Sequence, residues 1–153
     1  MCTNHTCDRI LMIRKFIDTD IESVLNIWLC ASIKAHDFIE ASFGESKLDD
    51  MRKKYIPDSE SFVFEQSSVV IGFYSLMGSI LAAISVMPEF QGKGIGKKLL
   101  SHAIKQRPNL TLSVYKENIA SYQFYCSQGF SIVHEQNDIH TGHLEYTMTN
   151  SCT

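Results

Sequence analysis

A short apolar run followed by a glycine-rich loop constrains this chain more than any other stretch. Residues 80–86 (ILAAISV) have the length and apolar content of a strand covered on both faces. Pro88 ends the run, because proline cannot donate to a sheet ladder. Residues 91–96 (QGKGIG) then carry glycine at alternate positions, and Ile95, Leu99 and Ala103 recur with helical spacing. The stretch therefore predicts a strand, a glycine-rich turn and an amphipathic helix.

This turn predicts a phosphate-binding site. Backbone N–H groups at a helix N-terminus are unpaired and meet the positive end of the helix dipole. Lys93, Lys97 and Lys98 add positive charge. The spacing excludes a Walker loop, since no Ser or Thr follows the lysines, and a dinucleotide fingerprint, since Lys97 stands at its third glycine position. What remains is Q-x-x-G-x-G after a strand that ends in V-x-P.

Length, charge and cysteine content narrow the class of protein. A chain of 153 residues predicts one domain, for which we expect residues 12–150, after a flexible polar arm at residues 1–11. The net charge of −3 favours neither nucleic acid nor an anionic membrane as partner, and no apolar run reaches the ~18–20 residues of a membrane span. Five cysteines without a C-x-x-C pair indicate a reducing, cytoplasmic location.

The remaining patterns predict a mixed α/β chain. Thr19 and Glu22 form a capping-box pattern before a helix that contains Trp28, for which a core position is expected. Ser46 is expected to cap a second helix, which stops before Pro57. After the loop helix, Asn118 is expected to cap a further helix that runs through Gln128, with Gly129 in the left-handed position that follows. Cys30 and Cys126 are expected near the core. The predicted strands are residues 13–17, 62–65, 69–74, 80–86, 110–115, 130–135 and 144–148.

A second motif strengthens the interpretation. Residues 118–130 follow the pattern N-x-x-A-x-x-F-Y-x-x-x-G-F, with Ser121 in place of the alanine. Together with the loop and the element order, this motif resembles the GNAT N-acetyltransferase superfamily from about residue 62 to the end, although Gln91 stands where arginine is frequent. The resemblance implies the GNAT fold: a mixed α/β sheet of about seven strands with a splayed central parallel pair, flanked by about four helices.

The resemblance also implies a cofactor and a set of site residues. The donor would be acetyl-CoA, whose acetyl group passes directly to a primary amine in a ternary complex. Backbone groups of residues 84–86 would pair with the pantetheine arm, residues 91–97 would hold the pyrophosphate, and Tyr125 would act as general acid. The implied cofactor-binding residues are Ile84, Ser85, Val86, Gln91, Gly92, Lys93, Gly94, Ile95, Gly96, Lys97, Asn118 and Tyr125.

The chemistry gives an independent reason for the tyrosine, but leaves the base open. A thiol has a pKa near ~8.5 and a phenol near ~10, so a phenol can share its proton with the departing thiolate. Residues 80–86 contain no carboxylate. Candidate bases are therefore His36, Glu65, or a water chain held by Ser85 or Tyr115, with His36 favoured because imidazole is neutral at pH 7. The expected acceptor contacts are His36, Phe38 and Tyr115.

The predicted function is acetyl transfer from acetyl-CoA to a peptide, protein or small-molecule amine, with a slight preference for peptide or protein acceptors. The missing strand carboxylate motivates one alternative, a non-catalytic acyl-CoA sensor or interaction module. A second, an acetyltransferase toxin acting on aminoacyl-tRNA, is disfavoured because no broad basic stripe is present. Residues 140–143 (HTGH) predict a hairpin turn and not a metal site, since two histidines lack a third ligand. A homodimer through edge strands is left open.

Overall fold

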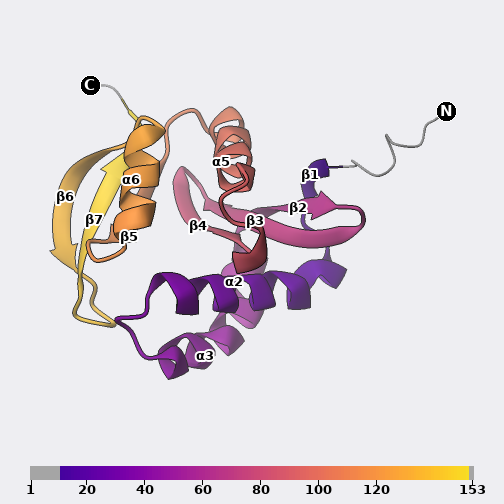
Figure 1. Ribbon diagram of the computed structural model, residues 1–153, viewed down its shortest axis with the longest axis horizontal. Helices are drawn as coiled ribbons and strands as arrows, with labels where there is room; N and C mark the ends of the chain where they lie inside the picture. The colour runs from indigo at the N-terminus through magenta and orange to yellow at the C-terminus, as the bar shows by residue number, and fades with distance from the viewer. Residues whose placement is uncertain (1–10, 152–153) are drawn as a thin grey trace.

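The computed structural model describes residues 11–151, which form one seven-stranded sheet with helices on both faces (Figure 1). The strand order is β1-β2-β3-β4-β5-β7-β6. The strands are β1 (Leu11–Lys15), β2 (Glu60–Gln66), β3 (Val69–Met77), β4 (Ile80–Val86), β5 (Thr111–Tyr115), β6 (Ser131–Asn137) and β7 (Leu144–Thr149). Of the predicted N-terminal arm, residues 1–10 lie outside the described residues, and Leu11 begins β1.

The longer helices pack in two layers. Their bounds are α2 (Ile21–Ala35), α3 (Ala41–Asp50), α5 (Ile95–Gln106) and α6 (Ile119–Ser127), and shorter turns are η1 (Asp18–Asp20), a π-helical η2 (Met51–Tyr55), α4 (Ile56–Asp58) and η3 (Pro88–Phe90). No helix formed by residues 11–151 is both long and apolar enough to cross a membrane.

Alternation along β2 shows how the two layers share one sheet. Phe62 and Phe64 point into the core that α5 covers, whereas Val63 between them packs with Val24 and Ile27 of α2. Successive side chains of a strand face opposite sides, so a run of buried residues requires a cover on each side. These two layers explain the burial of β2 and β3 on both faces. The strand for which such burial was predicted, β4, is only partly buried, with Ile80 52% exposed.

The parallel pair at the centre of the sheet diverges. All other neighbours are antiparallel, but β4 and β5 run parallel and share a single registered pair, Ile80 with Thr111. Ala82 is an extra residue in β4, because Ser75 pairs with Ala83 while the next residue of β3 pairs with Leu81. A bulge of this kind bends its strand and increases the twist. The fold predicted from the resemblance, including its splayed pair, is confirmed.

Four local predictions are wrong. The helical segment after α3 does not stop before Pro57, because α4 (Ile56–Asp58) contains this proline near its start. Thr19 does not cap α2: the backbone N–H of Ile17 donates instead to the Asp20 carboxylate at 2.9 Å. Ser46 lies inside α3, which begins five residues earlier, and its hydroxyl donates to the Phe43 carbonyl at 2.6 Å. Cys126 is exposed and not near the core.

Asp20 is the N-cap residue of α2, and its carboxylate holds this end of the helix against β1. Its carboxylate is 7% exposed and accepts two hydrogen bonds from Arg14, at 2.8 and 3.0 Å. The Arg14 guanidinium, which donates both bonds, is the main reason why the pKa of Asp20 lies below its ordinary value. Asp20→Asn should lower the free energy of unfolding by about 1.5–3 kcal/mol at pH 7, since bonds to charged groups contribute about that much.

The contribution of Asp20 to the free energy of unfolding should decrease at low pH. A carboxyl with a lowered folded-state pKa stabilises the protein above its unfolded pKa of about 3.9, and this contribution is lost as pH falls through the folded value. The difference between wild type and Asp20→Asn, measured by urea unfolding, should therefore be constant above pH 5 and shrink below it. Asp49→Asn is the control, because Asp49 and its partner Lys53 are both mostly exposed. Equal losses in the two variants would contradict the assignment.

Candidate active site

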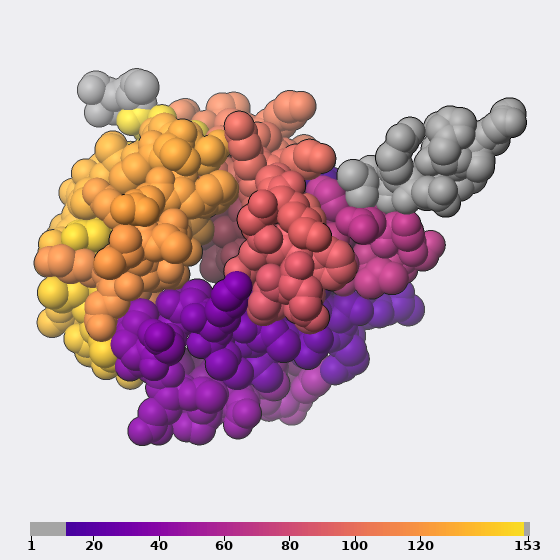
Figure 2. Space-filling view, viewed as in Figure 1, coloured from indigo at the N-terminus to yellow at the C-terminus, as the bar shows by residue number. Residues whose placement is uncertain are grey.

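A cleft of about 940 Å³ opens where β4 and β5 separate. Figure 2 shows it as a hollow between α5, α6 and the end of α2. The cleft is lined by most of the residues predicted from the sequence: Ile84, Ser85, Val86, Gln91, Gly92, Gly94, Gly96, Lys97, Asn118, Tyr125, His36 and Tyr115. Three are not part of this lining. Ile95 is buried in the core, the Lys93 ammonium lies 5.7 Å from the Phe90 ring centroid, and Phe38 packs against Tyr115.

The glycine loop forms one end of the cleft. Gly92 and Gly94 have φ values of +78° and +84°, a region that favours glycine, and a Cβ at either position would meet no atom within 4 Å. Gly94 is also the N-cap residue of α5. The amide of Gln91 donates to the Val86 carbonyl at 3.0 Å, and its oxygen accepts from Lys34 at 3.0 Å. These two bonds tie the loop to β4 and α2 and leave its glycines open to the cleft.

Tyr125 lies in the middle of the cleft wall. It is buried at 9% exposure, and its ring packs against Phe124 and Phe130, with ring centroids 5.4 and 5.9 Å away. Burial raises the pKa of the phenol, so the hydroxyl keeps its proton at neutral pH. Within residues 11–151 the hydroxyl makes no hydrogen bond that would occupy it. A buried donor of this kind is suited to a ligand atom in the cleft.

Asn118 joins two distant parts of the site. Its Oδ1 atom accepts the backbone N–H of Ser121 at 3.3 Å, which caps α6 as predicted. Its Nδ2 atom therefore faces Nε2 of His36 at 3.2 Å, so this imidazole nitrogen accepts and the neutral ring carries its proton on Nδ1. Burial lowers the pKa of His36 below its ordinary value of 6.5. His36 is consequently neutral at physiological pH.

Aromatic rings and the final hairpin close the far end of the cleft. Tyr115 packs edge-on against His36 and Phe38, with centroids 5.0 and 5.6 Å away, and its hydroxyl donates to Asp138. Burial is the main reason why the pKa of Tyr115 rises to about 12, and the bond to Asp138 adds to it. His143 pairs with Glu117 at 2.8 Å. Residues 140–143 thus form the predicted turn, and no three potential metal ligands cluster within residues 11–151.

The structure removes one candidate base. Glu65 lies on β2, pairs with Arg14 at 3.2 Å and does not line the cleft. Ser85 and Tyr115 do line it, although the Tyr115 hydroxyl already donates to Asp138. His36 is the one histidine of the described chain that lines the cleft.

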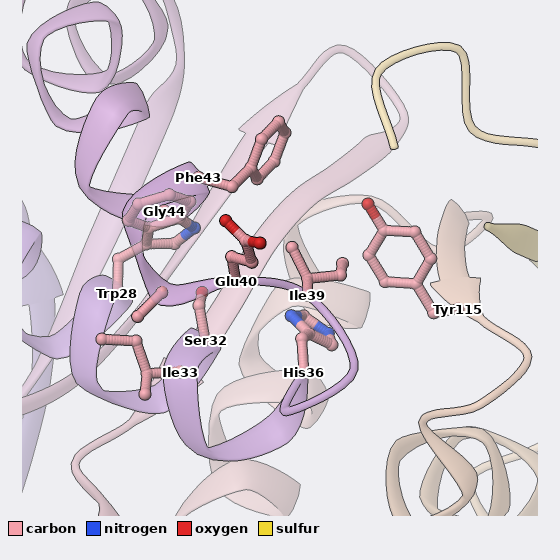
Figure 3. Close-up of a pocket in the computed structure, with 10 residues that line it drawn as sticks. Trp28, Ser32, Ile33, His36, Ile39, Glu40, Phe43, Gly44 and Tyr115 are labelled. Carbon is pink, nitrogen blue, oxygen red and sulfur yellow. The ribbon is translucent and has the colours of Figure 1, made fainter. Parts of the chain in front are cut away.

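Sequence reasoning missed part of the wall formed by α2. Trp28 is partly buried, as expected of a core aromatic, but it also lines the cleft together with Ser32. Trp28, Ser32 and His36 are spaced by four residues and lie on one helical face. This spacing was the available signal. A second pocket of about 140 Å³ adjoins the cleft behind these residues (Figure 3).

Comparison with known proteins decides the family. The profile of the Acetyltransferase (GNAT) domain matches residues 57–132. Peptidyl-lysine N-acetyltransferase YiaC of Escherichia coli K12 is 34% identical over 123 residues, which cover 80% of this chain and 84% of the relative. The chain belongs to the GNAT acetyltransferase family. A second relative, peptidyl-lysine N-acetyltransferase YjaB of the same strain, is 30% identical over 125 residues, covering 80% and 84% of the two chains.

Solved GNAT structures share the fold. Apo YjaB from Escherichia coli has a TM-score of 0.82 at 24% identity and covers 94% of this chain and 99% of its own. The PaiA N-acetyltransferase of Thermoplasma acidophilum, in complex with coenzyme A, has a TM-score of 0.75 at 20% identity, with 93% and 99% covered. This GNAT protein is an acetyl-CoA-dependent N-acetyltransferase, as predicted, and the sensor alternative is not favoured.

Proposed function

We propose that the chain acetylates lysine side chains of peptides or proteins. The observation that carries this proposal is the match to two relatives named peptidyl-lysine N-acetyltransferase, each over 80% of this chain. The open cleft of about 940 Å³ supports it, because a chain that bears a lysine can enter at the His36 end while the glycine loop lies at the other. We further propose that the enzyme is cytoplasmic, because its cysteine pattern indicates a reducing location. The net charge of −3 supports the proposal that it has no nucleic-acid or membrane partner. Homodimerisation is left open.

The residues of the cleft fit acetyl-CoA. The glycines of the loop leave backbone N–H groups open for a pyrophosphate, and the divergence of β4 from β5 leaves an unpaired strand edge at residues 84–86 for an amide-bearing arm. When bound, acetyl-CoA supplies a thioester, which is an acyl donor with a thiolate leaving group. The N–H groups of residues 91–96 and Lys97 would hold the phosphates, and Asn118 would bond the arm.

Two side chains are proposed to move protons. As the amine nitrogen bonds to the carbonyl carbon and the carbon–sulfur bond breaks, the Tyr125 hydroxyl donates its proton to the departing sulfur. A backbone N–H near Val86 receives the carbonyl oxygen. His36 accepts the proton that the ammonium of the acceptor must lose, once Asn118 exchanges its bond to Nε2 for one to the cofactor arm. The nitrogen gives up its second proton after the attack, and that proton restores the Tyr125 phenol. Ammonium and thioester thus become an amide and a thiol, and His36 passes its one proton to solvent.

A lysine-peptide assay tests the acceptor. We expect release of coenzyme A, detected with a thiol reagent, from acetyl-CoA and peptides with one internal lysine and an acetylated N-terminus. Mass spectrometry should place one added acetyl group on that lysine. Matched peptides with methionine in place of the lysine should be inert. Turnover of small amines with none of any lysine peptide would refute the proposed acceptor.

The pH profile tests the base. The pKa of His36 is lowered by burial, so the neutral form that acts as base predominates down to a pH below about 6.5. The kcat/KM for the peptide should therefore rise with pH along a limb centred below 6.5, and His36→Gln should remove this limb. His134→Gln is the control, because His134 is exposed on β6. An unchanged limb in His36→Gln would exclude His36 as the base.

A further inference from the structure

The smaller pocket adjoins the acceptor end of the cleft. It lies between α2, the segment of residues 36–40 and α3, and it shares Trp28, Ser32, His36 and Tyr115 with the cleft. Because of these shared walls, a peptide whose lysine enters the cleft passes the pocket mouth. Its volume of about 140 Å³ is close to that of an engineered cavity of ~150 Å³ that holds benzene, so it has room for one side chain.

A carboxylate stands among the aromatic walls of this pocket. Figure 3 shows the carboxylate of Glu40 between Trp28 and Tyr115. Glu40 is the N-cap residue of α3, yet its side chain makes no capping bond, and the Ser42 hydroxyl donates to it only at 3.4 Å. The carboxylate has no basic partner within 4.0 Å in the described chain. It is therefore available to a cation that enters from the cleft.

The other walls suit a long basic side chain. Aromatic faces attract cations, and the aliphatic stems of lysine and arginine pack on apolar surface. Ile33 and Ile39 supply that apolar surface. Phe43 already has a cation of the chain itself over its ring, since the Lys47 ammonium lies 5.4 Å from the ring centroid. His36 is neutral, so it adds no charge here, and Lys47 is a positive charge of the described chain that competes at this wall.

We propose that this pocket binds an arginine or lysine side chain located close to the acceptor lysine in the substrate. The enzyme then selects acceptor lysines in locally basic sequences. This inference rests on the proposed function, because it takes a peptidyl lysine as the acceptor.

The test is a peptide series around one acceptor lysine. Arg, Leu, Ala or Glu is placed in turn at each of the two positions before and after the lysine, and kcat/KM is measured with saturating acetyl-CoA. Glu40 is exposed, so its ion pair contributes little and the aromatic rings contribute the rest. Arginine should therefore exceed alanine by about tenfold at one of these positions. Glutamate should be the poorest residue at that position.

Two variants should move the preference in opposite directions. Glu40→Gln should reduce the Arg-to-Ala ratio to about two, because only the aromatic contribution remains. Lys47→Met should raise the ratio, because it removes the competing charge. Glu45→Gln is the matched control: Glu45 is an exposed carboxylate of α3 outside the pocket, and both its ratio and its rate on the alanine peptide should equal those of wild type.

The outcomes separate the two proposals. Leucine preferred over arginine, or a ratio that Glu40→Gln leaves unchanged, would overturn the basic-residue pocket while lysine acetylation stands. Equal rates on all peptides would do the same. No acetylation of any lysine peptide would overturn the proposed acceptor, and the pocket assignment with it.

Discussion

Tyr125→Phe should lower kcat by about 10²–10³ with little change in the KM for acetyl-CoA, because a positioned acid contributes rate and not binding. The hydroxyl makes no hydrogen bond within the described chain that the phenylalanine would lose, and the ring contacts with Phe124 and Phe130 are kept. The variant should therefore unfold at the same temperature as wild type. Steady-state kinetics and thermal unfolding measure the two quantities.

The control for this variant is on the same helix. Tyr122 does not line the cleft, and its ring packs against Tyr146 with centroids 5.3 Å apart. Tyr122→Phe should keep the wild-type kcat. The acid also has to be matched to its leaving group. The decrease in kcat caused by Tyr125→Phe should therefore be smaller with an acyl donor whose thiol has a lower pKa than with acetyl-CoA. Equal kcat values for wild type and Tyr125→Phe would remove Tyr125 from the mechanism.

Gly92→Asp should weaken the binding of coenzyme A by about 100-fold. The substitution places a side chain in a left-handed conformation, which costs ~1–3 kcal/mol, and it sets a negative charge where the pyrophosphate is proposed to bind. An added Cβ meets no atom within 4 Å, so the loss does not come from a steric clash with the protein. Titration calorimetry with coenzyme A gives the dissociation constant directly.

Gly78→Asp separates the two contributions. Gly78 lies in the turn between β3 and β4, has φ +61° and likewise has nothing within 4 Å of an added Cβ. It therefore carries the same backbone strain and the same charge, but at the opposite end of β4 from the loop. Its stability should fall as in Gly92→Asp while its coenzyme A affinity stays that of wild type. Wild-type affinity in folded Gly92→Asp would refute the loop as the phosphate site.

Most predictions that depended on neighbouring residues agree with the structure, and the Ser46 cap is an exception. The strand, the glycine loop and α5 follow from patterns within a few residues, as do the Asn118 cap of α6 and the left-handed Gly129 after it, with φ +94°. The failure at Thr19 depended on a distant partner. Neither Thr19 nor Asp20 caps α2 with its side chain, because the Asp20 carboxylate binds Arg14 of β1 and the Ile17 N–H.

Burial of single aromatic residues was predicted less well. Trp28 serves a core and a cleft wall together, because it is partly buried against apolar residues of α2 and its neighbours and also lines the cleft. Its sequence position does not distinguish these roles. His36 was the favoured base candidate by residue type and Glu65 a weaker one, and the fold places Glu65 beside Arg14 and His36 beside Asn118.

The sequence by itself determined the glycine loop that is proposed to bind the donor, because such a loop is built from consecutive backbone groups whose conformation depends on local glycines. Only the tertiary structure decided the end of the cleft that is proposed for the acceptor. His36 and Asn118 are 82 residues apart in the chain, and the pocket around Glu40 exists because α2, α3 and β5 converge there. Contacts of that separation depend on how β4 and β5 diverge, and no short segment of the chain encodes that divergence.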